Sequence, residues 1–375
     1  MSTDQTFEIF LVATPGLEPT LRAEAVEAGF ADPVAVAGGV TVRGGWTEVW
    51  RANLRLRGAS RVLVRIGGFR AMHLAQLDKR ARRFPWGEYL RRDIPVRVEV
   101  TSRASRIYHA GAAAQRIETA LREELGVPVV AEAAEAGVRL KVRIEDDFCT
   151  FSLDTSGEPL HRRGHKEAVG KAPMRETLAA LFLRECGYTG GEPVIDPMCG
   201  SGTFVIEAAE IALGLAPGRS RSFAFEQFAG FDAAGWEAMR KTAATPRAVD
   251  LRFRGFDRDT GAVRMAAGNA ARAGVEDVTE FAHQAVSDLQ RPEGPPGLVM
   301  VNPPYGDRIG QRHMLHAVYG ALGRTLLERF SGWRVGLVTT EPSLARSTGL
   351  PFGQPGPHVP HGGLKIRLFR TGPLP

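Results

Sequence analysis

The chain has 375 residues, of which 43% are apolar and 24% are charged, proportions typical of a soluble globular protein. That length exceeds what one ordinary hydrophobic core organises, so two or three domains are expected. The sequence contains no run of about 18 consecutive apolar residues, the length needed to cross a membrane. The first residues, Met1–Phe10, lack the basic and apolar regions of a secretory signal.

Cysteine and histidine are few and scattered. The three cysteines form no CxxC pair, and the nine histidines include no HExxH sequence. We therefore expect neither a disulfide framework nor a metal site. The reducing cytoplasm is the expected location, because thiols stay reduced there.

Positive charge is unevenly distributed along the chain. The formal net charge is +6, but residues 51–116 alone hold 16 lysines and arginines against 4 acidic residues. Such a concentration is typical of proteins that bind a polyanion such as RNA. An arginine-rich composition inherited from a GC-rich genome would give the same count without any partner, so charge alone leaves both interpretations open.

Two small α+β units are predicted in the first part of the chain. A strand at Phe7–Ala13 and a helix at Leu17–Ala28, followed by a strand–strand–helix–strand series, favour a ferredoxin-like unit over residues 1–66. A second unit, residues 67–154, ends in two strands that are expected to form a hairpin across Glu145–Asp147.

Strands and helices alternate after a connector at residues 155–172 that is rich in glycine, histidine and basic residues. The alternation within residues 173–375 predicts an α/β domain, Rossmann-like, with a mostly parallel seven-stranded sheet. The strand at Leu364–Arg370 is expected to close one edge of that sheet. A segment near Gly214–Asp250 is expected to leave the sheet as an insertion.

A glycine-rich turn, DPMCGSGT at Asp196–Thr203, leaves one predicted strand and enters a helix. Gly200 and Gly202 permit a tight turn and a close approach of a ligand to the backbone. The N–H groups at the start of the helix favour an anionic group such as a carboxylate. Val205 stands where a dinucleotide GxGxxG motif needs its last glycine. An ordinary strand-to-helix turn is the simpler alternative.

Asp257 ends the next predicted strand, in the sequence FRGFD. A carboxylate in that place can accept two hydrogen bonds from a ribose diol. Asp259 is the neighbouring candidate for the same contact. An exposed acid at a strand end is the purely structural interpretation.

The tetrapeptide Asn302-Pro303-Pro304-Tyr305 directly follows an apolar strand. An exocyclic amine of a base is a poor nucleophile, because its lone pair is delocalised into the ring. The Asn302 Oδ1 atom and the Pro303 carbonyl could accept both amine hydrogens and position the nitrogen, and Tyr305 could stack on the base. A proline-rich turn is the alternative interpretation.

Together the two motifs resemble class I S-adenosylmethionine-dependent methyltransferases that act on exocyclic amines. Longer stretches are similar to the THUMP-domain methyltransferases, in particular the RlmL type that methylates guanine N2 in 23S rRNA. These stretches are Ala172–Ala180, DPMCGSGTFVIEAA, Asn302–Arg308 and the connector Leu153–Gly164.

The resemblance implies an RNA-gripping N-terminal half, in which residues 67–154 form a THUMP unit, and a C-terminal catalytic domain. It implies S-adenosylmethionine as the cofactor and S-adenosylhomocysteine as the product. The residues that would clamp the target base are Asn302, Pro303, Pro304 and Tyr305. The residues that would surround the cofactor are Thr177, Asp196, Met198, Cys199, Gly200, Ser201, Gly202, Thr203 and Asp257.

Two positions depart from the family pattern. The acid expected to contact the cofactor adenine falls on Ala285, and Asp288 is the substitute. The connector carries His165-Lys166 where a Tyr-Arg pair is usual. The chain ends soon after the catalytic domain, as in family members with one methyltransferase domain.

Several functional alternatives remain open from the residues. They are guanine-N2 methylation of tRNA, adenine-N6 methylation of a nucleic acid, methylation of a protein glutamine, and RNA binding without catalysis. Covalent catalysis by Cys199 is disfavoured, because its place in the turn suits packing. Arg103 and Arg106 are expected to contact RNA phosphates. The sequence does not specify the nucleotide, the state of the RNA substrate or the oligomeric state.

Overall fold

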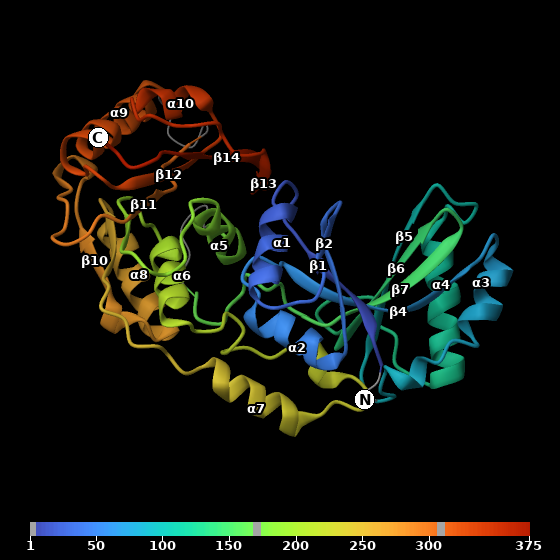
Figure 1. The fold of residues 1–375 in the computed structure, drawn as a ribbon. Helices are drawn as coiled ribbons and strands as arrows, with labels where there is room; N and C mark the ends of the chain where they lie inside the picture. The colour runs from blue at the N-terminus through green and yellow to red at the C-terminus, as the bar shows by residue number, and fades with distance from the viewer. Residues whose placement is uncertain (1–4, 168–173, 306–311) are drawn as a thin grey trace. The chain divides into compact units, whose positions relative to one another are not determined.

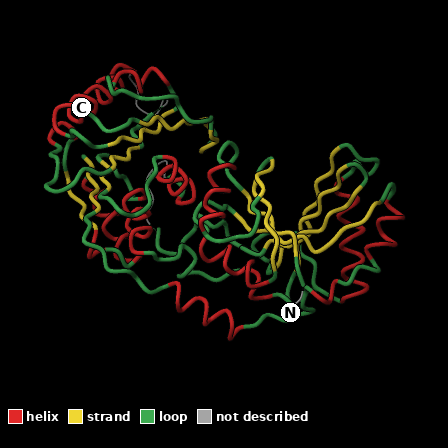
Figure 2. The backbone as a smooth tube through the Cα atoms, viewed as in Figure 1, coloured by secondary structure: helices red, strands yellow, loops and turns green. Residues whose placement is uncertain are grey.

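The computed structural model describes residues 5–167, 174–305 and 312–375. Its elements group into two compact units (Figure 1), and Figure 2 distinguishes their helices from their strands. Unit 1 contains Met1–Ala13, Glu24–Leu160 and Arg221–Thr242; unit 2 contains Thr14–Ala23, His161–Ser220 and Ala243–Pro375. Each unit is therefore discontinuous in sequence, and helix α1 (Glu18–Glu27) is divided between them.

Unit 1 is built on a seven-stranded sheet of order β2-β3-β1-β4-β7-β6-β5. Neighbouring strands are antiparallel except for β5 and β6, which are parallel. The strands are β1 (Phe7–Val12), β2 (Val34–Val36), β3 (Gly39–Gly44), β4 (Arg61–Arg70), β5 (Val96–Arg103), β6 (Val138–Glu145) and β7 (Phe148–Asp154). The helices that lie wholly or mainly in this unit are α2 (Trp46–Arg55), α3 (Leu74–Ala81), α4 (Ala110–Ala120) and α7 (Ala233–Ala243), with short turns η1 (Trp86–Glu88), η2 (Leu121–Leu125) and η3 (Ala224–Gln227).

Strand β4 joins the two predicted α+β units. It pairs with β1 on one side and with β7 on the other, so it runs across residues 66 and 67. Both predicted units therefore share one continuous sheet. The domain limits at 66 and 154 remain predictions, because pairing of strands does not by itself define where a domain ends.

Local sequence patterns explain the elements of unit 1. Strand β1 alternates buried and partly exposed residues, as a strand with one covered face does. Helix α2 buries Trp46, Val49, Trp50 and Leu54, which recur at helical spacing on one side. The predicted hairpin between β6 and β7 is confirmed, and its turn residues Asp146 and Asp147 both adopt left-handed φ angles of 49° and 62°.

The predicted insertion after residue 214 does leave the sheet, and part of it completes unit 1. Trp50 of α2 packs against Phe225 and Trp236, whose ring centroids lie 6.1 and 6.3 Å away. Arg221 donates hydrogen bonds to the carbonyl oxygens of Ser156, Glu158 and Pro159. Residues encoded within the C-terminal half thus form an aromatic core with N-terminal residues.

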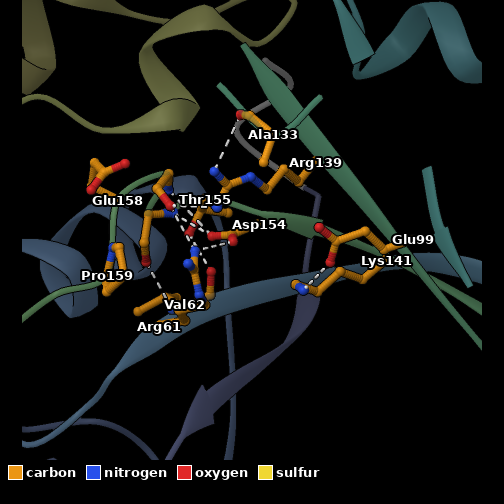
Figure 3. A network of polar contacts seen from close by, with 12 residues as sticks. Arg61, Val62, Glu99, Ala133, Arg139, Lys141, Asp154, Thr155, Glu158 and Pro159 are labelled. Carbon is orange, nitrogen blue, oxygen red and sulfur yellow. Dashed lines mark hydrogen bonds and ion pairs between the residues drawn. The ribbon is translucent and has the colours of Figure 1, made fainter. Parts of the chain in front are cut away.

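The first part of the connector is also anchored to unit 1 (Figure 3). Asp154 is fully buried, forms an ion pair with Arg61, and accepts hydrogen bonds from the backbone of Ser156 and Gly157. Burial raises the pKa of the Asp154 carboxyl, although the nearby Arg61 charge opposes that shift. Thr155 donates to the Val62 carbonyl at 2.7 Å. These bonds fix the chain as far as Leu160.

Unit 2 is the expected Rossmann-like domain. Its seven-stranded sheet has the order β10-β9-β8-β11-β12-β14-β13, and the strands from β10 to β12 are parallel. The strands are β8 (Val194–Asp196), β9 (Phe253–Asp257), β10 (Thr279–His283), β11 (Leu298–Val301), β12 (Arg334–Thr339), β13 (Val359–His361) and β14 (Leu364–Arg370). The helices are α5 (Glu176–Glu185), α6 (Thr203–Leu213), α8 (Thr260–Ala273), α9 (Arg312–Arg329) and α10 (Pro342–Ser347), with turns η4 (Glu276–Val278) and η5 (Val286–Asp288).

Burial in unit 2 follows its parallel topology. Every residue of β11 is buried, because a parallel strand is covered on both faces. Strand β14 was expected at a sheet edge, but it pairs with both β12 and β13, so the edge is β13. The short β13 carries too little periodic pattern to be detected from sequence. Strand β10, with only intermediate or exposed residues, was missed for a similar reason.

Candidate functional site

The glycine-rich turn joins β8 to α6 through a set of local hydrogen bonds. Met198 N donates to Asp196 Oδ1 at 3.0 Å, and Gly202 N donates to the Cys199 carbonyl at 2.8 Å. Gly200 and Gly202 have φ angles of 52° and 83°, in the left-handed region that favours glycine. The backbone conformation of the turn therefore favours glycine at both positions, independently of any need for a ligand to approach closely.

Gly202 is also constrained by its neighbours. A Cβ atom there would lie 3.0 Å from the Cβ of Ala266 in α8 and 3.2 Å from the ring of Phe281 in β10. At Gly200, by contrast, no heavy atom lies within 4 Å of such a Cβ atom among the described residues. Gly202 is needed for close packing, whereas the space beside Gly200 can admit a ligand.

Asp257 is placed beside this turn by strand pairing. β8 and β9 are parallel neighbours, and Asp257 Oδ2 accepts a hydrogen bond from Gly200 N at 3.0 Å. Its Oδ1 accepts from Asp259 N at 2.9 Å. Each carboxylate oxygen has a second lone pair, so both can still accept a hydrogen bond from a diol. Asp259 instead caps α8 by accepting from Gly261 N at 2.8 Å.

Two titratable groups in the turn are deeply buried. Burial, opposed by the hydrogen bond from Met198 N and assisted by the nearby Asp257 charge, raises the pKa of the Asp196 carboxyl to about 8. Burial also raises the pKa of the Cys199 thiol far above its ordinary value. A thiol so resistant to ionisation is a poor nucleophile, which agrees with the packing interpretation of Cys199.

The predicted tetrapeptide follows β11 on the other side of β8. Tyr319 of α9 holds it, because the Tyr319 hydroxyl lies 3.3 Å from the Pro304 carbonyl oxygen and 3.1 Å from Thr339 Oγ1 at the end of β12. Pro303 and Tyr305 are buried, and Pro304 is exposed. The residues that continue this loop in the family pattern, Gly306–Arg308, lie outside the described residues.

Two acceptors of the tetrapeptide have no donor among the residues that the structure describes. Within residues 5–167, 174–305 and 312–375, the buried Asn302 Oδ1 atom has no hydrogen-bond partner. In the same described set, no hydrogen bond reaches the Pro303 carbonyl, although the next carbonyl is bound by Tyr319. Buried acceptors are normally satisfied, so an orphaned amide oxygen calls for an external donor. These are the two atoms that the sequence argument assigned to an amine.

The three motifs lie together at the carboxyl ends of the parallel strands. β9, β8 and β11 are adjacent and parallel, so Asp257, the glycine-rich turn and Asn302 all follow the carboxyl ends of neighbouring strands. Ligands in open α/β sheets bind outside these ends. The parallel topology thus brings together residues that are about a hundred positions apart in sequence.

Lys166 is a site residue that sequence reasoning noted only as a departure from the family. Its Nζ donates to Thr203 Oγ1 and to the Met174 carbonyl, both at 2.9 Å, and lies 3.1 Å from Glu176 Oε1. All three ammonium hydrogens are therefore engaged. Lys166 ties the connector to the first residue of α6. Thr177, predicted near the cofactor, is buried in the first turn of α5 beside this cluster.

Asn269 was missed altogether. This buried residue of α8 donates a hydrogen bond from Nδ2 to the Ser201 carbonyl at 3.1 Å. The bond links the glycine-rich turn to α8. The available signal was a single amide among the alanines at 262, 266, 270 and 273, which form the buried side of the helix. A polar residue at such a position needs a buried partner.

Asp288 and Ala285 follow β10, whose end is paired with Asp257. Both residues are exposed, and Asp288 Oδ1 lies 3.2 Å from Ser287 Oγ. An adenine contact by Asp288 remains a prediction. Within the described residues, no group of three or more histidine, cysteine or acidic side chains could hold a metal ion, and no helix is long and apolar enough to span a membrane.

The basic segment lies in unit 1, and the fold neutralises part of its charge. Arg61 and Arg65 form ion pairs with Asp154 and Glu8, and Arg82 contacts three carboxylates at once. Arg103, the last residue of β5, and Arg106, in the loop that follows, are the predicted phosphate contacts, and both are exposed. The count from sequence therefore overstates the positive charge that remains for RNA.

Comparison with known proteins gives two family matches. Residues 163–350 match a family described as RMKL-like, methyltransferase domain, and residues 8–63 match an RlmL ferredoxin-like domain. A "Ribosomal RNA large subunit methyltransferase K/L" of Syntrophotalea carbinolica is 34% identical over 363 residues, which cover 92% of this chain and 51% of that protein. The chain thus spans about half the length of the curated relatives it matches.

Solved structures share the whole fold. A predicted N6-adenine-specific DNA methylase from Listeria monocytogenes is 28% identical, with a TM-score of 0.84 over 98% of this chain and 97% of that one. SMU.472, a putative methyltransferase complexed with SAH, is 26% identical, with a TM-score of 0.85 and full coverage of both chains. These likenesses confirm the expected methyltransferase fold in unit 2.

Proposed function

Because the chain belongs to the RMKL-like methyltransferase-domain family, which depends on S-adenosylmethionine, we propose that it methylates the exocyclic N2 amine of a guanine in large-subunit rRNA. The relatives are named for the methylation of that RNA. Since rRNA is made and assembled in the cytoplasm, that is the proposed location. The observation that carries the choice of an amine is the pair of acceptors at Asn302 and Pro303, which have no donor within residues 5–167, 174–305 and 312–375.

The residues at the sheet edge fit the cofactor. The space beside Gly200 and the first turn of α6 suit its amino-acid portion, and the free lone pairs of Asp257 suit its ribose. When bound, S-adenosylmethionine supplies an electrophilic methyl group. Cys199 and Asp196 are buried, so that region would exclude water.

The tetrapeptide then positions the nucleophile. Asn302 Oδ1 and the Pro303 carbonyl would accept the two amine hydrogens, and the methylated nitrogen would then release one proton to solvent. Tyr319 holds the loop at Pro304 so that its neighbour's carbonyl stays available. Catalysis in this arrangement comes from orientation rather than from a strong base. The target base must be unpaired to reach such a pocket.

The experiment uses methyl-labelled S-adenosylmethionine with separate rRNA and tRNA fractions, followed by identification of the labelled nucleoside. Labelled N2-methylguanosine in large-subunit rRNA supports the proposal. The same nucleoside in tRNA would instead identify tRNA as the substrate. The Asn302→Ala variant serves as the inactive control, and calorimetry with S-adenosylhomocysteine verifies that it still binds cofactor. Absence of cofactor binding by the wild-type chain in the same calorimetry would favour an RNA-binding factor instead.

Adenine-N6 methylation is the second candidate, because the Listeria structure is described as an N6-adenine-specific DNA methylase. A clamp for two amine hydrogens accepts either base. Identification of the labelled nucleoside also separates these two candidates. Labelled N6-methyladenosine, or its deoxynucleoside when DNA is the substrate, would replace N2-methylguanosine.

A further inference from the structure

The glycine-rich turn contains one peptide unit whose orientation is held by another element. The unit joins Ser201 to Gly202, and a peptide unit beside a glycine rotates easily, because no Cβ atom obstructs it on that side. Its N–H group, on Gly202, donates to the Cys199 carbonyl at 2.8 Å. Its carbonyl, on Ser201, accepts a hydrogen bond from Asn269 Nδ2 at 3.1 Å. Both polar ends of the unit are therefore fixed, one of them by a side chain of α8.

The Asn269 amide can hold the turn in only one of its two orientations. An amide has an acceptor on one side and donors on the other, and a half-turn of the group exchanges them. With its oxygen toward the Ser201 carbonyl, two acceptors would face each other and repel. Asn269 is fully buried, so water does not restrain the amide. A neighbouring group within the fold has to select the orientation that places the nitrogen toward Ser201.

Arg272, three residues further along α8, makes this selection. Its Nη2 donates to Asn269 Oδ1. A guanidinium has donors only, so the amide presents its oxygen to Arg272 and its nitrogen to Ser201. The Nε atom of the same guanidinium donates to the His165 carbonyl at 2.8 Å. Nε and Nη2 form one edge of the planar group, so the two bonds together fix its plane.

The ion pair of Arg272 does not explain this arrangement. Its Nε lies 3.7 Å from Glu167 Oε2, but the Glu167 side chain is 73% exposed, and exposed pairs contribute little. The other bonds of Arg272 link the connector to the glycine-rich turn. Lys166, also in the connector, reaches Thr203 Oγ1 at the end of the same turn, at 2.9 Å. The connector therefore holds the turn by two separate routes.

We propose that Arg272 is a positioning residue for the cofactor: by fixing the Asn269 amide, it holds the Ser201–Gly202 peptide unit in the orientation that cofactor binding requires. Gly200, beside the space assigned to the cofactor, directly precedes this unit, and its N–H group donates to Asp257. Rotation of the unit would disturb both the space and the carboxylate. The inference rests on the proposed function in one respect, that the turn binds S-adenosylmethionine.

The test measures S-adenosylhomocysteine binding to the full chain by calorimetry, and the KM for S-adenosylmethionine and kcat with the rRNA fraction. Arg272→Met keeps a long side chain but removes every donor. It should weaken binding about fivefold, the effect of one hydrogen bond, and raise KM by a similar factor. The kcat at saturating cofactor should stay within about twofold, because the clamp at Asn302 is untouched. A purely structural role would lower the melting temperature without this split.

Substitutions of Asn269 test whether Arg272 acts through it. Asn269→Ala should weaken binding at least as much as Arg272→Met. Adding Arg272→Met to Asn269→Ala should change the affinity by less than about twofold, because the relay is already broken. Asn269→Asp keeps an acceptor for Arg272 but offers the Ser201 carbonyl no donor. It should therefore bind the cofactor as weakly as Asn269→Ala does.

Two variants serve as matched controls. Arg264→Met removes an exposed arginine of the same helix, and Glu167→Ala removes the exposed ion pair of Arg272. Both should bind S-adenosylhomocysteine as the wild type does. The inference is overturned if Arg272→Met keeps its affinity within twofold, if the two losses multiply in the double variant, or if Glu167→Ala reproduces the loss.

Two further outcomes separate this inference from the proposed function. If Asp257→Ala weakens S-adenosylhomocysteine binding and Arg272→Met does not, the cofactor site stands and the inference fails. If cofactor affinity depends on Arg272 and Asn269 as described but no RNA is methylated, the proposed reaction fails and the inference stands.

Discussion

The two units contain sheets of equal strand number but opposite organisation. Unit 1 has an almost wholly antiparallel sheet, and unit 2 has a mostly parallel one. In the parallel sheet, three motifs far apart in sequence meet at the carboxyl ends of β9, β8 and β11. In the antiparallel sheet, exposed residues of neighbouring strands gather at a corner formed by a hairpin and a loop.

The difference has a physical origin. The central strands of a parallel sheet are covered on both faces, so they are continuously apolar and polar chemistry collects at their ends. An antiparallel sheet with one solvated face can expose cations and rings along its strands and turns. Unit 2 is thus suited to a dry, positioned reaction, and unit 1 to contact with a large charged ligand. Four predictions test this contrast, from the largest expected effect to the smallest.

The first prediction tests which unit is stabilised by the aromatic residues of the insertion, such as Trp236. Trp236→Ala, in a residue only 3% exposed, should destabilise the protein by about 3–5 kcal/mol through lost packing against Trp50 and Phe225. Hydrogen exchange should increase in unit 1, although the residue lies in the C-terminal half of the chain. Trp333→Ala is the control and should open unit 2. Faster exchange in unit 2 for both variants would contradict the assignment.

The second prediction concerns the motifs at the carboxyl ends of the parallel strands. Asn302→Ala should reduce methyl transfer by about 10²–10³-fold, a loss like that of one transition-state hydrogen bond, while cofactor binding survives. Steady-state turnover and calorimetry measure the two quantities. Tyr319→Phe removes only the hydroxyl near Pro304 and should cost a smaller factor. Turnover near the wild-type value for Asn302→Ala would rule out the clamp.

The third prediction is a pH dependence confined to unit 2. Burial, assisted by Arg175 and other neighbouring cations, lowers the pKa of His161 to about 4 from an ordinary value near 6.5. The unfolded chain therefore binds more protons between pH 6.5 and 4. Stability should fall as the pH drops through that window, by less than the full pKa shift would give, because solvent screens this partly exposed ring. Denaturant titrations should show a flatter profile for His161→Gln, and an identical profile would contradict the shift.

The fourth prediction compares two glycines of one turn. Gly200→Ala should cost about 1–2 kcal/mol for a left-handed backbone alone. Gly202→Ala should cost more, because its Cβ atom also meets Ala266 at 3.0 Å. Urea denaturation measures the free energy of unfolding for both variants. Equal losses would show that α8 yields to the added methyl group.

The sequence predicted the α/β class, the elements with strong periodicity and the place of the catalytic motifs. The predicted strand at Phe7–Ala13 and helix at Leu17–Ala28 agree with β1 and α1 to within one residue at each end, because alternation and a following glycine define them locally. The elements β10 and β13 escaped prediction. Each is short, and their burial patterns depend on neighbouring strands rather than on their own residues.

What the sequence determined by itself is local: the glycines that a left-handed turn requires, the apolar run of a covered strand, and the chemical types present at Asn302 and Asp257. The tertiary structure decided which of these meet and what they lack. It added Lys166, Asn269 and Tyr319, because their partners lie 37, 68 and 15 residues away. Among the described residues it also left the Asn302 oxygen without a donor, since satisfaction of a buried group depends on everything packed around it.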